Sequence, residues 1–341
     1  MNYWSAQSFA NKVIEYYERH GRKHLPWQQS NDPYPIWLSE VMLQQTQVTT
    51  VIPYFEKFIV ELPTVKHLAE ASDDKVMSLW SGLGYYSRAR NLHKAAKMVM
   101  QQFAGEFPKQ QEQLEQLPGV GRSTAGAIAS FAFGQPTAIL DGNVKRVLAR
   151  CYTIQGWPGH GKVLKELWYR AEQNTPKHST AKYNQAMMDI GALICTRSSP
   201  KCEKCPLSER CLALKQDQIA LFPGKKAKKE RPSKAVYWLV QINNGSVLLY
   251  KRQPHGIWGG LWSLPEIEQQ ETAPEHMEEL APFVHKFSHY DLHIQPLLVE
   301  KSPNIGIMET AQSDWFSMST IADIGVPAPV GKLIKALHKT L

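Results

Sequence analysis

The chain has 341 residues, enough for about two domains with buried cores, and a formal net charge of +8. Residues 1–234 carry 32 Lys and Arg against 20 Asp and Glu, a net of +12, whereas residues 235–341 carry 7 against 11, a net of −4. An apolar run of about 20 residues, as a membrane span needs, is missing, and residues 1–10 lack a signal-peptide core. We therefore expect a cytoplasmic protein whose first part meets a polyanion.

The first predicted helix covers residues 2–18, where apolar side chains recur at helical spacing, and Gly21 then ends it. The next segment, Arg22 to Trp27, mixes basic and aromatic side chains around Leu25 and a proline. Such a mixture lines base pockets by stacking. A Trp beside a proline also packs simply into a core, and the residues alone leave both interpretations open.

Glu40 lies in the first turns of a mostly apolar helix predicted at 36–50. A carboxylate in this setting is either a solvated acid favoured by the helix dipole or a half-buried group with a raised pKa. The second kind of group is suited to donating a proton. The sequence alone does not choose between them.

Helices predicted at 53–62 and 65–80 lead to a glycine turn at 82–84. Tyr85 follows this turn, ahead of two arginines in a basic helix. An aromatic side chain in this position suits wedging between bases while the arginines hold phosphates. The alternative is ordinary packing in the core.

A glycine hairpin at 118–121 joins a polar, helix-compatible segment at 111–117 to a small-residue helix at 122–133. We expect positive φ angles at Gly119 and Gly121, and the absence of side chains there lets another backbone approach closely. The helix after the hairpin would present free N–H groups and the positive end of its dipole. This arrangement favours contact with a nucleic-acid phosphate.

Asp141 stands between the apolar residues 138–140 and a basic helix predicted at 144–150. The ordinary interpretation of an Asp here is a helix N-cap. The alternative is a catalytic carboxylate.

Four of the five cysteines lie within 17 residues and are separated by six, two and five residues. Zinc sites usually have two short Cys pairs a dozen or more residues apart, so this spacing favours a [4Fe–4S] cluster, with zinc as the alternative. Cys151 stands apart and is expected to be a small buried residue. Four basic residues lie between the cysteines and suit contact with phosphates: Arg197, Lys201, Lys204 and Arg210.

Residues 222–234 form a basic, proline-containing linker, and the pattern changes after it. Amphipathic helices at 162–174 and 182–193 complete an all-α region. After the linker, strands at 235–242 and 246–252 flank an Asn-Asn-Gly turn, which indicates a hairpin. We expect an α+β domain with these further elements: a helix near 273–280, strands within 283–299 and 313–316, and a helix after Gly331.

The hairpin, an Asp about twenty residues on, and the cysteine spacing resemble the helix-hairpin-helix DNA glycosylases that carry an iron–sulfur cluster. Residues 38–48, 82–92 and 140–150 and the C-terminal region are similar to adenine DNA glycosylases of the MutY type. The resemblance implies a glycosylase domain at 1–221 with a [4Fe–4S] loop at 195–211. It also implies a Nudix-like domain at 235–341.

The resemblance gives roles to the ambiguous carboxylates. It implies that Glu40 protonates the leaving adenine and that Asp141 stabilises the oxocarbenium-like sugar. One protonated and one ionised carboxyl group also suit glycosidic cleavage on chemical grounds. Ser123 occupies the position at which bifunctional relatives of the endonuclease III type have a lysine nucleophile, so we expect no Schiff base and no strand cleavage.

The remaining site residues come from the same resemblance. Adenine is extruded from the duplex into a pocket lined by Arg22, Leu25 and Trp27. DNA contacts are expected from Gln45, Leu83, Tyr85, Gly119, Val120, Gly121 and Ser123, and cluster ligation from Cys195, Cys202, Cys205 and Cys211. Recognition of 8-oxoguanine is expected from Phe287, Ser288 and His289, which without the resemblance would be taken for a strand edge. The Glu-rich magnesium helix of Nudix hydrolases is missing, because Glu278 and Glu279 lack its spacing.

The sequence thus predicts a monomeric, monofunctional, nucleoid-associated glycosylase that acts on double-stranded DNA containing 8-oxoguanine·adenine or guanine·adenine mispairs. One alternative is a bifunctional pyrimidine-lesion glycosylase and lyase. Another is a non-catalytic DNA-binding iron–sulfur protein. The sequence names no replication or repair partner.

Overall fold

The computed structural model describes residues 4–227, 230–267, 277–287, 289–299 and 312–340. It divides into two compact units. The helical unit comprises Met1–Ile59, Thr64–Lys66 and Ala95–Lys228, and the strand-containing unit comprises Val60–Pro63, His67–Lys94 and Lys229–Leu341. The sequence-based domain boundaries place 60–63 and 67–94 in the first domain, and these boundaries remain a prediction.

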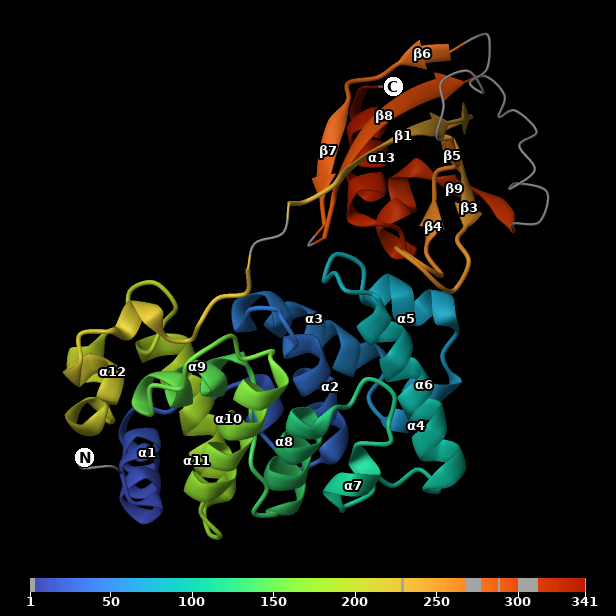
Figure 1. Cartoon of the computed structure of the whole chain (residues 1–341). Helices are drawn as coiled ribbons and strands as arrows, with labels where there is room; N and C mark the ends of the chain where they lie inside the picture. Colours follow the sequence, from blue (N-terminus) through green and yellow to red (C-terminus); the bar gives the residue numbers. More distant parts are fainter. Residues whose placement is uncertain (1–3, 228–229, 268–276, 288, 300–311, 341) are drawn as a thin grey trace. The chain divides into compact units, whose positions relative to one another are not determined.

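Within the helical unit, α1 and α8–α11 share an apolar core. In Figure 1, α1 lies beside α11, and the core includes Phe9, Val147 and Tyr183. The α-helices assigned wholly or mainly to this unit are α1 (Ala6–His20), α2 (Pro33–Leu43), α3 (Val48–Glu61), α7 (Gln111–Leu114), α8 (Arg122–Phe133), α9 (Gly142–Cys151), α10 (Gly161–Asn174), α11 (Thr180–Asp189) and α12 (Leu212–Lys215).

The helix expected at 36–50 is in fact two helices. The first, α2, begins at Pro33 after the N-cap Asp32 and ends at Leu43, and α3 begins at Val48. Between them Gln45 is exposed and has a φ of 60°, a left-handed conformation that non-glycine residues adopt rarely. The apolar spacing continues through this break, and periodicity therefore predicted a single helix.

Further helical segments are α4 (Val65–Glu70), α5 (Asp73–Leu79), α6 (Ser87–Gln102) and the π-helical turn Ile190–Ile194 that continues α11. The 3₁₀ turns are Pro26–Gln28, Cys202–Lys204, Ser208–Arg210, Ile219–Leu221 and Met318–Asp323. None of the helices in the described ranges is long and apolar enough to cross a membrane.

Two sheets form the C-terminal part of the strand-containing unit. The first has the order β5-β1-β8-β6, with β7 also paired to β8; β1 and β8 are parallel and the other pairs are antiparallel. The second has the order β2-β3-β4, with β9 on β3. The strands are β1 (Ser233–Val240), β2 (Ile242–Asn243), β3 (Ser246–Lys251), β4 (Trp262–Ser263), β5 (Glu266–Ile267), β6 (Met277–Glu279), β7 (Phe283–Lys286), β8 (Asp291–Val299) and β9 (Ser313–Ser317), and α13 (Ala328–Thr340) closes the chain.

The prediction of a helix near 273–280 is wrong for the residues that the structure describes. Residues 277–279 form β6, paired antiparallel to the end of β8, while 273–276 lie outside the described residues. Pairing with a long neighbouring strand outweighs the helical preference of the Met-Glu-Glu sequence. The closing helix also begins earlier than expected, at Ala328.

Candidate active site and cysteine pocket

Glu40 lies about two turns into α2, because the helix begins at Pro33 rather than at Ile36. This position removes it from the first turn, where the helix dipole would favour a solvated acid. The pKa of Glu40 is raised to about 8, first by burial of the carboxyl group and then by the negative charge of Asp141. The structure thus brings together two carboxyl groups that are 101 positions apart in the sequence.

Asp141 is the N-cap of α9, as expected from its position in the sequence. Its Oδ1 accepts a hydrogen bond from the Val144 N–H at 2.8 Å, and its Oδ2 accepts one from the Asn143 side chain at 3.0 Å. Both carboxylate oxygens therefore accept hydrogen bonds, which fix the orientation of the group. One side chain serves as cap and as a fixed negative charge beside Glu40.

Ser123 lies in the first turn of α8 and is tied to the residue before Asp141. Its Oγ accepts a hydrogen bond from the Leu140 N–H at 2.9 Å. The Ser123 hydroxyl group thus fixes the backbone beside Asp141.

The glycine hairpin has one positive φ, not two. Gly119 has a φ of 80°, whereas Gly121 is extended with a φ of −95° and is the N-cap of α8 without a side-chain cap. Apart from Gly121 itself, its chain neighbours and the adjoining backbone of α8, no atom of the described residues lies within 4 Å of where a Cβ on Gly121 would be. The space outside this position is therefore open to a partner. Val120 is buried, and its N–H donates to the Leu117 carbonyl at 3.0 Å.

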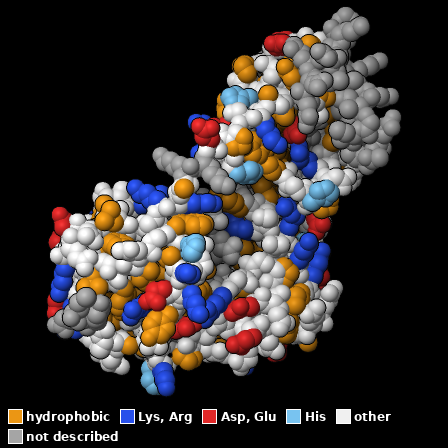
Figure 2. Space-filling view, in the orientation of Figure 1, with side chains coloured by type: hydrophobic (Ala, Val, Ile, Leu, Met, Phe, Trp, Pro, Cys, Tyr) orange, Lys and Arg blue, Asp and Glu red, His pale blue; other side chains and the backbone are white. Residues whose placement is uncertain are grey.

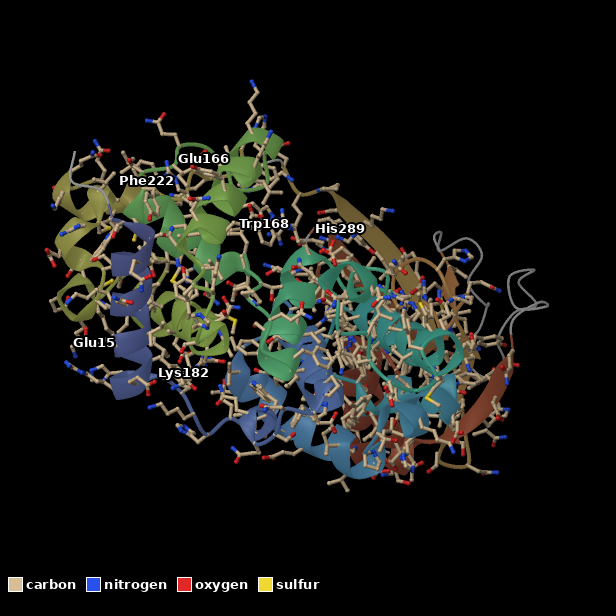
Figure 3. The ribbon with its side chains drawn as sticks, turned by 90° about the horizontal axis from the view of Figure 1, so that it is seen from below. Glu15, Glu166, Trp168, Lys182, Phe222 and His289 are labelled. Atoms are coloured by element: carbon tan, nitrogen blue, oxygen red, sulfur yellow. The ribbon has the colours of Figure 1, made fainter. Side chains whose placement is uncertain are left out.

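The start of α8 is tied to α10 through Arg122. The guanidinium group lies 4.0 Å from the ring centroid of Trp168, which Figure 3 labels, and it is paired with Glu172. A stacked and ion-paired arginine fixes the direction of the helix start. The open N-terminus of α8 is therefore suited to binding an anion.

The residues expected to line the adenine pocket are mostly packed. Arg22 donates to the fully buried Asp189 from its backbone N and its Nε, both at 2.8 Å, with Nη2 at 2.6 Å. Gln185 also donates to Asp189, at 2.8 Å. Leu25 and Trp27 are buried, and the Trp27 ring meets Phe55 edge-on at 5.3 Å.

The pairing of Arg22 with Asp189 was not visible in the sequence. Asp189 is a lone acid in an apolar stretch, 167 positions from Arg22, and periodicity carries no signal for such a contact. Nε and Nη2 both lie within reach of Asp189 Oδ1, while Oδ2 accepts from the Arg22 backbone N–H, so these contacts fix the guanidinium group.

The expected wedge residues differ in exposure. Tyr85 is 49% exposed with a φ of 50°, and its ring lies 5.5 Å from the Arg88 guanidinium. Gln45 is exposed, whereas Leu83 is buried. Two of these three side chains are therefore accessible to DNA in this conformation.

Phe287 and His289 lie in the turn between β7 and β8, so the alternative of a plain strand edge is not what the structure shows. The Phe287 N–H donates to the Tyr290 carbonyl at 2.9 Å, which closes this turn. Ser288 lies outside the described residues.

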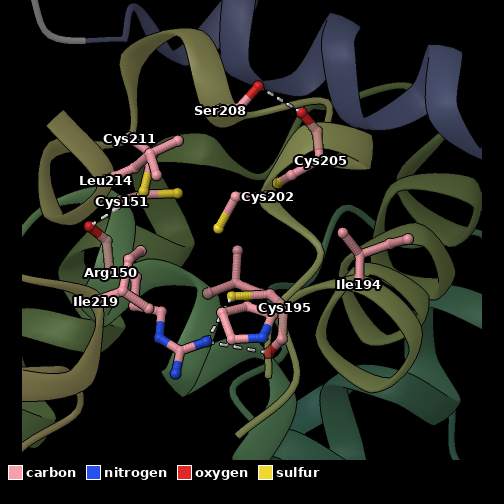
Figure 4. A pocket seen from close by; sticks show the side chains of 12 residues that line it. Arg150, Cys151, Ile194, Cys195, Cys202, Cys205, Ser208, Cys211, Leu214 and Ile219 are labelled. Carbon is pink, nitrogen blue, oxygen red and sulfur yellow. Dashed lines mark hydrogen bonds between the residues drawn. The ribbon is translucent and has the colours of Figure 1, made fainter. Parts of the chain in front are cut away.

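The four cysteines expected to bind the cluster line a single pocket together with Arg150 and Cys151 (Figure 4). In the part of the chain that the structure describes, no three His, Cys, Asp or Glu side chains gather closely enough to hold one metal ion. Four thiols that line one pocket are a donor set suited to an iron–sulfur cluster. The pKa of Cys211 is lowered to about 7, chiefly by a hydrogen bond with Cys151, which favours the thiolate form that ligates metal.

Arg150 holds the loop around this pocket. It is buried, and its guanidinium donates to the carbonyls of Thr196 at 2.7 Å, Arg197 at 3.0 Å and Phe222 at 2.9 Å, as well as to Cys195 Sγ at 3.3 Å. Cys151 is buried, as expected, and lies beside Cys211.

A second arginine connects the pocket to Asp141. Arg146 Nε donates to the Cys195 carbonyl at 2.6 Å, and Nη2 donates to Asn143 Oδ1 at 2.8 Å and to the Gly191 carbonyl at 2.6 Å. Asn143 in turn donates to Asp141. The cysteine loop and the carboxylate pair thus share one hydrogen-bonded path along α9.

Three segments of the chain match known families. Residues 38–173 match the HhH-GPD superfamily of base excision DNA repair proteins. Residues 195–211 match the iron–sulfur binding domain of endonuclease III, and residues 236–336 match the NUDIX domain. The cysteine pocket is therefore an iron–sulfur site.

Similar proteins cover nearly the whole chain. It is 41% identical over 345 residues to the adenine DNA glycosylase of Buchnera aphidicola subsp. Acyrthosiphon pisum, with 98% of each chain covered. It is 34% identical to human adenine DNA glycosylase, covering 84% of this chain and 66% of the human one. A solved thermostable thymine-DNA glycosylase has a TM-score of 0.55 and 28% identity, covering 62% of this chain and 97% of that one.

Proposed function

We propose that this chain, which belongs to the adenine DNA glycosylases, is a monofunctional, monomeric enzyme that removes adenine mispaired with 8-oxoguanine or guanine. The observation that carries the chemistry is the pair of Glu40 and Asp141, in which the first has a pKa of about 8 and lies near the second. The Glu40 carboxyl group then keeps its proton at neutral pH beside a second carboxyl group, the arrangement that suits glycosidic cleavage.

In the proposed reaction Glu40 donates its proton to a ring nitrogen of the extruded adenine. The N-glycosidic bond breaks, its electron pair leaves with the base, and positive charge develops on the sugar. Asp141, held by Val144 and Asn143, stabilises that charge. Water then adds to the sugar carbon and loses a proton, which leaves an abasic site.

The start of α8 is proposed to bind the phosphate backbone of DNA. Gly119 gives the hairpin its turn, and open space at Gly121 admits a phosphate. On the face of the helical unit shown in Figure 2, Lys and Arg side chains lie interspersed with apolar and acidic ones. The basic side chains are the ones that would meet the phosphates.

The iron–sulfur site takes a structural part in this proposal. Cys195, Cys202, Cys205 and Cys211 would hold a [4Fe–4S] cluster, which when bound supplies a rigid cross-link. Arg150 and Arg146 then relate the loop to α9 and Asp141. Visible absorption by a brown protein, against a colourless zinc form, tests the metal content.

Lesion recognition is proposed for the C-terminal sheets rather than nucleotide hydrolysis. Glu278 and Glu279 lie on the strand β6, and so cannot serve as the Glu-rich helix that holds magnesium in Nudix hydrolases. The recognition loop, defined here as residues 287–289, contains the hydroxyl of Ser288, which is able to hydrogen-bond to a lesion base.

The direct test uses a duplex with one central 8-oxoguanine·adenine pair, incubated with the protein and then treated with alkali. We expect breakage at the adenine. A break at the 8-oxoguanine, or an intact duplex, would contradict the proposed activity.

The monofunctional assignment has its own test, because Ser123 offers no amine for a Schiff base. Borohydride added during the reaction should trap no covalent protein–DNA adduct, and strand breaks should appear only after alkali. Efficient trapping would instead favour the bifunctional pyrimidine-lesion glycosylase and lyase.

A further inference from the structure

The two ends of the recognition loop are fixed by aromatic contacts. The Phe287 and Tyr290 rings are in contact at a tilt of 35°, with 4.8 Å between centroids, and the Phe287 N–H donates to the Tyr290 carbonyl at 2.9 Å. The exposed His289 ring meets Tyr290 at 4.9 Å. The position of the loop therefore depends on what supports Phe287.

Trp258 provides that support from a different part of the fold. Its ring centroid lies 5.1 Å from that of Phe287 and 5.4 Å from that of His285, at the end of β7. On its other sides it meets Trp238 of β1 edge-on at 6.1 Å, and the Arg252 guanidinium at 5.8 Å. Trp258 is only 8% exposed. It lies in the loop that joins β3 to β4, two strands of the second sheet.

The backbone around Trp258 is built to hold this ring in place. Trp258 has a φ of 56°, a left-handed conformation that is unfavourable for a bulky residue and persists only where its surroundings enforce it. The Gly260 N–H donates to the Arg252 carbonyl at 3.1 Å, and the Leu261 N–H donates to the Trp258 carbonyl at 3.1 Å. A Cβ on Gly259 would lie 2.7 Å from the Pro254 carbonyl oxygen, so the loop closes tightly on itself.

The neighbours of Trp258 are themselves fixed. Arg252 pairs with Glu266 at 2.6 Å, and Glu266 accepts from Trp238 Nε1 at 3.3 Å. The contacts among Trp258, Trp238, Arg252 and Glu266 therefore connect β1 and β5 with the β3–β4 loop. This connected group of side chains supports the turn between β7 and β8.

We propose that Trp258 is a positioning residue for lesion discrimination: its ring sets the position of Phe287, at the start of the recognition loop, and hence the preference for 8-oxoguanine over guanine opposite the target adenine. This inference rests on the proposed function. A loop that is displaced by even about an ångström loses a directional hydrogen bond. Removal of the ring should therefore affect the lesion-specific contact and leave the chemistry at Glu40 unchanged.

The test compares Trp258→Leu, Trp258→Phe and the control Trp262→Leu in the full chain. Trp262 is also a buried tryptophan of this fold, but it packs on Phe316 of the second sheet at 4.7 Å. The measured quantity is kcat/KM for 8-oxoguanine·adenine divided by kcat/KM for guanine·adenine. This ratio does not depend on the fraction of protein that is folded, because both substrates meet the same enzyme.

We expect Trp258→Leu to lower this ratio by about tenfold, the size of effect expected from one misplaced hydrogen bond. Trp258→Phe should restore most of the ratio, and Trp262→Leu should leave it unchanged. Single-turnover excision of guanine·adenine at saturating enzyme should be the same in all four proteins.

Either of two results would overturn this inference and leave the proposed function standing. The first is an unchanged ratio in Trp258→Leu while the wild type prefers the lesion. The second is an equal fall of the ratio in Trp258→Leu and Trp262→Leu. A wild-type ratio near one has a different meaning. It would contradict the lesion specificity in the proposed function, and this inference with it.

Discussion

Glu40 needs its proton at the moment the adenine leaves, so its pKa of about 8 sets the alkaline limit of the reaction. We predict that kcat/KM is level from about neutral pH up to this value and falls about tenfold per unit above it, once Glu40 ionises. Glu40→Gln should lower excision by about 10²–10⁴-fold while still binding the mispair. A non-catalytic DNA-binding protein would show no such loss, and an activity that rises through pH 8 would contradict the assignment.

The raised pKa of Glu40 also makes the free energy of unfolding depend on pH. Its pKa is 4.5 ordinarily and about 8 in the fold, so between these values the unfolded chain releases a proton that the folded protein keeps. The contribution of Glu40 to the free energy of unfolding therefore falls as pH rises from about 4.5 to 8. Thermal unfolding should show that Glu40→Gln stabilises the protein more at pH 8 than at pH 5, and equal shifts at both would contradict the raised pKa.

A substitution at Asp141 can separate its role as the N-cap of α9 from its role as a negative charge in the reaction. Asn caps helices about as well as Asp, so Asp141→Asn should keep the bond from the Val144 N–H and change the free energy of unfolding by less than about 1 kcal/mol. Excision should fall by about 10²–10³-fold, the usual cost of removing one electrostatic contact to a developing charge. Calorimetry and single-turnover kinetics measure the two effects, and a large loss of stability with normal excision would leave Asp141 as a cap only.

At the scale of elements, local pattern predicted α8 at its observed bounds and Asp141 as the cap of α9. It failed at Gln44–Gln47, because apolar spacing runs unbroken through a turn that only the left-handed Gln45 reveals. It also failed at β6, which forms because β8 extends beside it. Sequence periodicity describes contacts within an element, whereas these features depend on partners elsewhere in the chain.

The path from the cysteine loop to Asp141 is another feature of this kind, since Arg146 and Cys195 are 49 positions apart. Arg146→Gln should lower excision by about 10–100-fold, as substitutions behind a catalytic or metal-binding group commonly do. Because Arg150 still holds the loop, the visible absorption of the cluster should persist. Lys145→Gln, one residue away on α9, removes the same charge without these bonds and serves as the control. Equal losses in both variants would show that charge, rather than the path, matters.

For the whole molecule, the sequence predicted two regions of opposite charge joined by a basic linker, and the structure shows where that linker starts. Phe222 is buried in the helical core, its carbonyl accepts from Arg150, and Gly224 packs against the Gly156 backbone. The next described strand begins at Ser233. The packed start of the linker could not be predicted, because the two prolines and six basic residues at 222–234 suggested an extended segment throughout.

Besides the linker, residues 67–94 connect the C-terminal region to the rest of the chain, because they belong to the same compact unit. The length of the linker therefore sets only part of the closure entropy for packing of the C-terminal region on these residues. Inserting ten Gly and Ser residues after Ala227 roughly doubles the free length between Gly224 and Ser233, which costs about 0.6 kcal/mol of closure entropy. We therefore predict a fall of about threefold in the preference for 8-oxoguanine·adenine, with single-turnover excision of guanine·adenine unchanged. The same ten residues appended to the end of the chain should alter neither value. A complete loss of preference on insertion would show instead that the linker holds a fixed geometry, and no change at all would show that the two parts act independently.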